Sequence, residues 1–225
     1  MNACTALIVA AGRASRMQGI DKIMAPLGGI PLILRTVRAM AACPEITKIL
    51  LVTRKDLIAP ITELCQKEPK FTKAIVGGET RAESVQKGLQ GVDTPWVAIH
   101  DGARPLVTAE VVCKAIATAQ TKGAAAPAIP VKDTVKVAEN SLVQSTPDRS
   151  RLFAVQTPQV FSTEGILQAL ETAISKHLPL TDDCSAMEAV GQPVCLTEGS
   201  EENLKITTPM DLLLAEAILA RRSAL

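Results

Sequence analysis

Short apolar runs alternate with longer amphipathic segments, and this alternation constrains the fold most. The strand-like runs lie at 5–10, 48–53, 73–76, 96–100 and 124–129. The helix-like segments between them lie at 32–42, 81–89 and 109–122. Strands and helices in alternation are joined by right-handed crossovers, and they form a mainly parallel sheet with helices on both faces. The pattern therefore predicts an α/β fold, and a length of 225 residues allows one domain or two.

The alternation ends after Pro130. Residues 132–138 alternate polar and apolar side chains, 139–141 offer a turn, and 142–146 supply a second strand. This segment predicts a two-stranded hairpin, which alone is only marginally stable in water. It must therefore pack on something. The residues leave open whether that is a second subunit or the hairpin's own domain.

Two further helices are predicted toward the C-terminus. One spans 163–177, and the other begins after Thr208, which can cap it together with Asp211 three residues later. Pro209 suits the first helical position. The predicted apolar stripe of the last helix consists of Met210, Leu213, Leu214, Ala217 and Ile218.

Composition excludes several classes of protein. Hydrophobic residues make up 47% of the chain, which argues against disorder. A net charge of +1 and an aromatic content of 2% argue against a nucleic-acid binder. No apolar run approaches the roughly 20 residues that span a bilayer. The first strand begins without a basic or cleavable leader, so we expect a cytoplasmic protein with no membrane partner.

The cysteines carry no metal-binding pattern. They are scattered without a Cys-x-x-Cys pair, which argues against a zinc site and predicts reduced, mostly buried thiols. His100 and His177 are too few and too far apart for a histidine-based metal cluster. The six cysteines are Cys4, Cys43, Cys65, Cys113, Cys184 and Cys195.

The first strand leads into a turn of small residues, 11–17, that contains Arg16 and is followed by Lys22. Small side chains let backbone N–H groups approach a bound anion, and the two cations add the charge that a triphosphate requires. The turn lacks both the Gly-Lys-Ser/Thr ending of a P-loop and the G-x-G-x-x-G of a dinucleotide fold. The alternative is an ordinary strand-to-helix turn with solvated basic residues.

Two more clusters are candidates for ligand contacts. Gly78 and its neighbour allow close approach to a flat base, with Glu79 and Ser84 adding polar groups, although alone this segment favours a plain turn before a capped helix. At the end of a predicted strand, Asp101 is placed to hold Mg²⁺ or a ribose hydroxyl, and Arg104 to meet a phosphate. A structural Asp–Arg pair is the alternative there.

Together with the segments around Arg149 and Lys205, these clusters resemble the 2-C-methyl-D-erythritol 4-phosphate cytidylyltransferases of the non-mevalonate isoprenoid pathway. The likeness spans Ala10 to Ile218. Its most specific motifs are His-Asp-Gly-Ala-Arg-Pro, Gln-Thr-Pro-Gln and Asn-Leu-Lys-Ile-Thr. It implies one Rossmann-like nucleotidyltransferase domain over 1–225, with a protruding β-arm at about 132–150. It also implies a homodimer whose arms reach into the partner's site.

The resemblance assigns catalytic and acceptor roles to matching residues. Arg16 and Lys22 match residues that stabilise the charged transition state, and Arg149 and Lys205 match those that position the attacking phosphate. Contacts to the sugar phosphate are implied for Arg104, Thr134 and Thr157. Of these residues, Thr134 and Arg149 would come from the other subunit.

The resemblance also assigns the nucleotide site. The phosphate turn matches at Ala11 and Gly12, and the cytosine pocket at Gly78, Glu79 and Ser84. Asp101 matches the acid beside the ribose and the metal, which implies Mg²⁺ or another divalent cation as cofactor.

Three positions depart from the family pattern. Ala14 replaces a glycine, and Asp21 and Ile23 flank the lysine where the family usually has Pro and Gln. Ala14 cannot adopt positive φ without strain, and Asp21 is predicted to weaken the positive field of Lys22.

The implied reaction is an in-line displacement. A phosphate oxygen of methylerythritol phosphate attacks the α-phosphorus of CTP, and pyrophosphate leaves. Two alternatives remain from sequence alone. One is a ribitol-5-phosphate cytidylyltransferase on the same scaffold, and the other is a non-catalytic nucleotide-binding protein.

Overall fold

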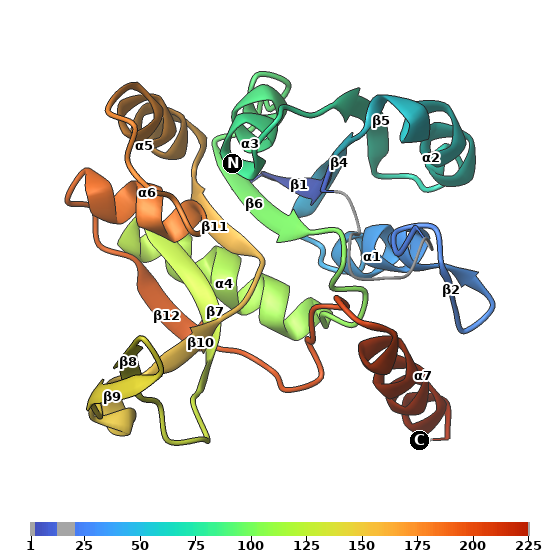
Figure 1. The fold of residues 1–225 in the computed structure, drawn as a ribbon. Coiled ribbons are helices and arrows are strands. Elements are labelled where there is room, and N and C mark those ends of the chain that lie inside the picture. Colours follow the sequence, from blue (N-terminus) through green and yellow to red (C-terminus); the bar gives the residue numbers. More distant parts are fainter. Residues whose placement is uncertain (1–2, 13–20, 225) are drawn as a thin grey trace.

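A computed structural model describes residues 3–12 and 21–224, built around one large sheet (Figure 1). Its strands run in the order β10-β7-β11-β6-β1-β4-β5, and β12 also pairs with β7. Each strand predicted from the alternating pattern is present and is at least one residue longer than predicted. The strands are β1 (Cys4–Ala10), β4 (Ile46–Thr53), β5 (Phe71–Val76), β6 (Trp96–Asp101), β7 (Ala124–Pro130), β10 (Phe153–Val155), β11 (Gln159–Ser162) and β12 (Cys195–Glu198).

The sheet is mostly parallel, as predicted. β1 pairs in parallel with β4 and β6, and β4 with β5. The exception is the segment 153–162, which contributes β10 and β11 antiparallel to β7 and β6. Parallel strands end at a common edge, so the turns that follow β1, β4 and β6 lie close together.

Helices cover both faces of this sheet, which confirms the predicted α/β class. Helix positions 81–89 and 109–122 match the prediction residue for residue, whereas α2 and α6 were not predicted. The helices are α1 (Leu32–Ala41), α2 (Ile58–Cys65), α3 (Arg81–Leu89), α4 (Ala109–Lys122), α5 (Thr163–Ser175), α6 (Asp183–Ala189) and α7 (Pro209–Ser223). None of the described helices is long and apolar enough to cross a membrane.

Alternation along β1 divides the core into two layers. Ala6 and Ile8 are fully buried on the face covered by α1, α2 and α4. Leu7 is fully buried on the opposite face, which α3, α5 and α6 cover. Because successive strand residues point to opposite faces, a central strand buried on both sides reads as a continuous apolar run.

The two strands of the arm are shorter than the sequence predicted. Its strands are β8 (Val137–Glu139) and β9 (Leu142–Ser145), so the prediction of a strand over 132–138 is wrong except at its last two residues. The two turn residues, Asn140 and Ser141, have φ of 49° and 66°, as a tight hairpin turn requires. Leu142 and Val143 are 68% and 60% exposed, so this hairpin does not pack on its own chain.

Helix α7 begins as predicted, with a capping box between Thr208 and Asp211. The predicted apolar stripe is wrong as a buried face except at Ile218, which is partly buried and packs against the cluster that contains Leu27 and Ala215. Ala215 is the buried residue of this helix, and Leu27 belongs to the small β2–β3 hairpin, formed by Pro26–Leu27 and Ile30–Pro31. The helix is apolar on more than one side, and its tertiary partner selects which side is buried. The exposed members of the predicted stripe are Ala217, Met210 at 70%, Leu213 at 65% and Leu214 at 54%.

Candidate functional site

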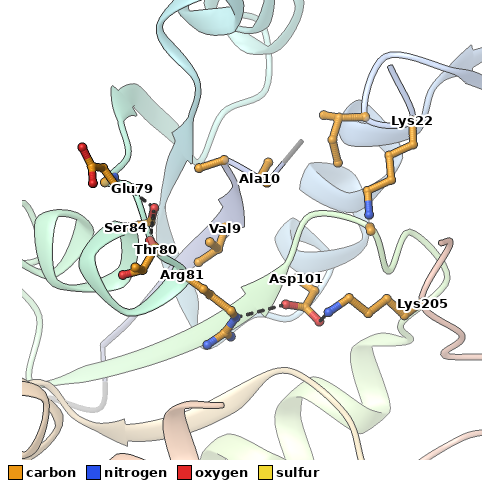
Figure 2. Close-up of a pocket in the computed structure, with 14 residues that line it drawn as sticks. Val9, Ala10, Lys22, Glu79, Thr80, Arg81, Ser84, Asp101 and Lys205 are labelled. Carbon is orange, nitrogen blue, oxygen red and sulfur yellow. Dashed lines mark hydrogen bonds and ion pairs between the residues drawn. The ribbon is translucent and has the colours of Figure 1, made fainter. Parts of the chain in front are cut away.

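A pocket lies at the carboxyl ends of β1 and β6 (Figure 2). It draws residues from the turn after β1, the segment before β2, the start of α3, the end of β6 and the chain before α7. This is the position that open α/β sheets use for ligands. The lining comprises Val9, Ala10, Ala11, Gly12, Lys22, Ile23, Gly78, Glu79, Thr80, Arg81, Ser84, Asp101, Ala103 and Lys205.

Asp101 is the anionic centre of the pocket. Its carboxylate lies 2.9 Å from Lys205 Nζ, 3.6 Å from Arg104 Nε and 3.7 Å from Arg81 Nε. Figure 2 shows Arg81 and Lys205 reaching it from opposite sides. Burial alone would raise the pKa of Asp101, but these cations lower it to about 2. These three cations outnumber the two carboxylates that they contact, Asp101 and the Asp183 that pairs with Arg81, which leaves one positive charge in excess for an anionic ligand.

Sequence reasoning gives no role to Arg81, the first residue of α3, but the structure places it in the pocket. Its guanidinium donates two hydrogen bonds to Asp183, at 2.8 and 2.7 Å. Burial would lower the pKa of Arg81, but the charges of Asp183 and Asp101 raise it, so the cation persists. Asp183 stands 102 positions away at the start of α6, so no local motif announces this pair.

Lys22 lines the pocket, and in Figure 2 its side chain extends toward the space beside Asp101. The neighbouring Asp21, predicted to weaken its field, forms an ion pair with Arg54. Asp21 also accepts a hydrogen bond from the backbone N–H of Ile23 at 3.1 Å. Arg54 offsets part of this negative charge, because it also pairs with Asp56 at 3.2 Å. Arg16 and Ala14 lie outside the described residues.

Gly77 and Gly78 form a turn before α3, and Gly78 lines the pocket. Ser84 Oγ accepts a hydrogen bond from the Gly78 N–H at 3.0 Å and donates one to the Thr80 carbonyl at 2.9 Å. A Cβ at Gly77 would lie 2.7 Å from Ala11 Cβ, so the absent side chain lets the two turns meet. The segment is thus a turn before a capped helix, as its sequence alone favoured, and it also lines the pocket. Glu79 lies there with its side chain exposed.

Thr157 holds the backbone of Asp101 in place through a hydrogen bond. Its hydroxyl is buried, accepts a hydrogen bond from the Asp101 N–H at 3.0 Å and contacts His100 Nδ1 at 3.0 Å. The other ring nitrogen of His100 faces the Arg104 carbonyl at 3.1 Å, so Nε2 donates and Nδ1 accepts from Thr157. Desolvation lowers the pKa of this buried histidine to about 4, which keeps it neutral at pH 7.

Four of the residues matched to the acceptor, namely Arg104, Thr134, Arg149 and the buried Thr157, are not part of this pocket lining. Arg104 is 12% exposed, and its Nη1 donates to the Asn203 carbonyl at 2.5 Å. Thr134 and Arg149 lie on the exposed arm, where Arg149 Nη1 donates to the Lys132 carbonyl at 2.6 Å. Within one chain the structure thus gathers the nucleotide residues and Lys205, and leaves the arm residues apart.

Asp101 also fits the predicted divalent cation. Mg²⁺ is typically held by one or two carboxylates together with substrate phosphates. Asp101 supplies an ionised carboxylate, and among the described residues its Oδ1 has the longest of the three ion pairs, to Arg81 at 3.7 Å. The surrounding cations disfavour a lone metal ion, so this site suits a cation that arrives with a polyphosphate.

Comparisons with known proteins agree on one family. The family model described as 2-C-methyl-D-erythritol 4-phosphate cytidylyltransferase matches residues 4–221. A protein of that name from Desulforamulus reducens is 45% identical, with 99% of this chain and 98% of the relative covered. Among solved structures, the 4-diphosphocytidyl-2C-methyl-D-erythritol synthase of Anaerococcus prevotii is similar with a TM-score of 0.87, at 31% identity over 97% of this chain and 96% of that one. The 2-C-methyl-D-erythritol 4-phosphate cytidylyltransferase of Thermus thermophilus has a TM-score of 0.81, at 33% identity over 96% and 98%.

Proposed function

The chain belongs to the 2-C-methyl-D-erythritol 4-phosphate cytidylyltransferase family, and from this premise we propose how its pocket carries out nucleotidyl transfer. The chain is a cytidylyltransferase of the non-mevalonate isoprenoid pathway. Its substrates are CTP and 2-C-methyl-D-erythritol 4-phosphate. The products are 4-diphosphocytidyl-2-C-methyl-D-erythritol and pyrophosphate. The family match favours this acceptor over ribitol 5-phosphate.

One observation carries the proposed use of the pocket. Lys22, Arg81 and Lys205 converge with Asp101 where β1 and β6 end. The triphosphate lies along these cations, and the cytosine lies against the turn of Gly78 and its neighbours. Backbone N–H groups after β1 complete the phosphate contacts.

The chemistry follows from charge and alignment. The acceptor phosphate is already an anion at neutral pH, so attack on the α-phosphorus requires no general base. Lys22, together with Arg16, meets the negative charge that develops on the α-phosphate and on the leaving pyrophosphate. Lys205 positions the attacking phosphate. Asp101, together with the substrate phosphates, would hold Mg²⁺, which would supply further neutralisation of the phosphate charge.

The arm supplies the rest of the acceptor site from a second subunit. Its two strands expose Val137, Leu142 and Val143, which are 50%, 68% and 60% accessible in the single chain. An isolated hairpin is marginal in water, so these side chains favour burial against a partner. Dimerisation brings Thr134 and Arg149 of one arm to the partner's pocket. The six free cysteines support a reducing, cytoplasmic location.

A substrate panel tests this proposal. Pyrophosphate release is followed with each of the four nucleoside triphosphates, Mg²⁺, and either methylerythritol phosphate or ribitol 5-phosphate. We expect release only with CTP and methylerythritol phosphate. Lys205→Met should lower turnover, whereas the control Lys114→Met should not, because Lys114 pairs with Glu198 outside the pocket. CTP binding without pyrophosphate release from either acceptor would contradict the proposal.

A further inference from the structure

Three metal-ligating side chains meet outside the nucleotide pocket. Cys43 Sγ lies 2.7 Å from Cys113 Sγ, and Glu45 Oε2 lies 3.1 Å from the first sulfur and 3.2 Å from the second. Cys43 follows α1, Glu45 precedes β4, and Cys113 lies on α4. Two thiols and one carboxylate oxygen therefore form a closed triangle, contributed by the loop between α1 and β4 and by α4.

This cluster lies at the end of the sheet opposite the pocket. The backbone N–H of Cys4, the first residue of β1, donates to the Glu45 carbonyl at 3.2 Å. The pocket begins near Ala10, where β1 ends. A strand of seven residues spans about 20 Å at roughly 3.3 Å per residue. The cluster is thus distinct from the nucleotide site.

The backbone around Cys43 is held in place. Lys70 Nζ donates to the carbonyls of Cys43 and Ala41 at 2.8 and 2.7 Å. The N–H of Ile46 donates to the same Cys43 carbonyl at 3.2 Å. Cys43 is fully buried, whereas Cys113 is partly accessible and Glu45 is exposed. The donor set is therefore anchored on its inner side and open to solvent on its outer side.

The hydrogen bonds of the cluster converge on one atom. Both thiols donate to Glu45 Oε2, so this oxygen already lies where an ion bound by both sulfurs would meet it. A metal ion between these three atoms replaces two thiol protons and keeps the carboxylate as a ligand.

The Glu45 carboxylate favours a metal site over a disulfide at this place. A disulfide between Cys43 and Cys113 would gain nothing from a carboxylate that contacts both sulfurs, because the negative charge of Glu45 would then lie against an uncharged S–S bond. Two thiolates and a carboxylate are instead a ligand set for Zn²⁺, which binds sulfur at about 2.3 Å and carboxylate oxygen at about 2.1 Å. Tetrahedral geometry would separate the sulfurs to roughly 3.8 Å, which a rotation of the partly exposed Cys113 side chain can provide.

We propose that Cys43, Glu45 and Cys113 form a binding site for a borderline-soft divalent cation such as Zn²⁺, with solvent at the fourth position. Binding releases two protons from the thiols. The cation fastens the loop between α1 and β4 to α4. Lys70, whose Nζ lies 2.8 Å from the Cys43 carbonyl oxygen, offsets the net negative charge of two thiolates, one carboxylate and a divalent ion.

The test uses the reduced full-length protein with Zn²⁺ and, as a spectroscopic probe, Cd²⁺. We expect one Zn²⁺ per chain at this site, release of two protons, and an ultraviolet thiolate-to-Cd²⁺ charge-transfer band. Loss of an outer-shell partner weakens metal sites 10–100-fold, so loss of a ligand in Cys113→Ser should weaken binding by at least about 100-fold. Cys195→Ser is the matched control, because Cys195 is also partly exposed but lies on β12.

Glu45→Gln keeps the test decisive if Cys113→Ser fails to fold, because the Glu45 side chain is exposed. It should weaken Zn²⁺ binding by at least about tenfold. Zn²⁺ should also raise the Tm of the unsubstituted protein and of Cys195→Ser, but not that of Cys113→Ser. Equal Zn²⁺ affinity in the unsubstituted protein, Cys113→Ser and Glu45→Gln would overturn the proposal.

Discussion

Replacing Arg81 with Met should destabilise the fold strongly as well as impair the pocket. The reason is Asp183, whose side chain is 1% exposed and which receives two hydrogen bonds from Arg81. Without the guanidinium, the buried Asp183 carboxyl, whose pKa burial already raises, either stays charged without a partner or takes up a proton, and both outcomes cost unfolding free energy. Removing one partner of a buried ion pair in this way costs about 3–5 kcal/mol of unfolding free energy.

The expected change is large enough to measure without ambiguity. For a chain of this size, 1 kcal/mol corresponds to about 2–4 °C in Tm, so Arg81→Met should lower Tm by about 6–20 °C. Arg38→Met is the matched control. Arg38 makes one contact to Glu68 and is 53% exposed, so its loss should cost less than about 1 kcal/mol. Chemical denaturation of both variants measures the two free energies.

A double variant isolates the pair itself. In Arg81→Met combined with Asp183→Asn no buried charge is left unpaired. The combined loss should therefore be smaller than the sum of the single losses by about 1–3 kcal/mol. Additive losses, or an Arg81→Met variant as stable as Arg38→Met, would refute the view that Asp183 depends on this cation.

Three further outcomes follow from the structure. The pKa of His100 is lowered to about 4, so its folded form stays neutral while the unfolded chain takes up a proton below about pH 6.5. The unfolding free energy should therefore fall by about 3 kcal/mol as pH drops from 6.5 to 4, and an acid titration should show a smaller fall in His100→Gln but not in His177→Gln. Gly77→Ala places a Cβ 2.7 Å from Ala11 Cβ and should cost about 1–3 kcal/mol in thermal denaturation, whereas a Cβ at Gly12 meets no described atom within 4 Å, so Gly12→Ala should leave stability unchanged. Leu142→Glu places a charge on the arm and should convert a dimer to monomers in analytical ultracentrifugation without lowering the protomer's helix content; a dimer that persists would count against the proposed interface.

The central strands and helices were predicted well from the sequence, because their apolar residues are spaced as burial in a sheet or against a helix face requires. Residues 81–89 and 109–122 begin after the capping residues Thr80 and Thr108, and both helices appear at these positions. Helix α2 was not predicted because Pro60 interrupts its apolar pattern. The first turn of a helix nevertheless tolerates proline, and Pro60 lies there. The arm strand was placed too early because alternation alone does not show where a partner strand begins.

The candidate site was predictable only in part. Asp101 ends β6, where the fold class itself predicts a ligand, and Lys22 was found because it follows the turn of small residues after β1. The contact of Arg81 with Asp183, by contrast, joins residues 102 positions apart. Cys43 and Cys113 meet across 70 positions, so their spacing resembled scattered thiols. Such pairs depend on tertiary packing, which neither periodicity nor motif spacing encodes.

In the proposed mechanism, positive charge in the pocket stabilises the transition state and does more than bind the substrates. Single-turnover pyrophosphate release by Lys22→Ala, at saturating CTP, methylerythritol phosphate and Mg²⁺, measures this most directly. Loss of one preorganised charge-stabilising group typically slows the chemical step by about 10²–10³-fold, and we expect a decrease of that size with a much smaller change in CTP affinity. A rate close to that of the unsubstituted enzyme would contradict the account.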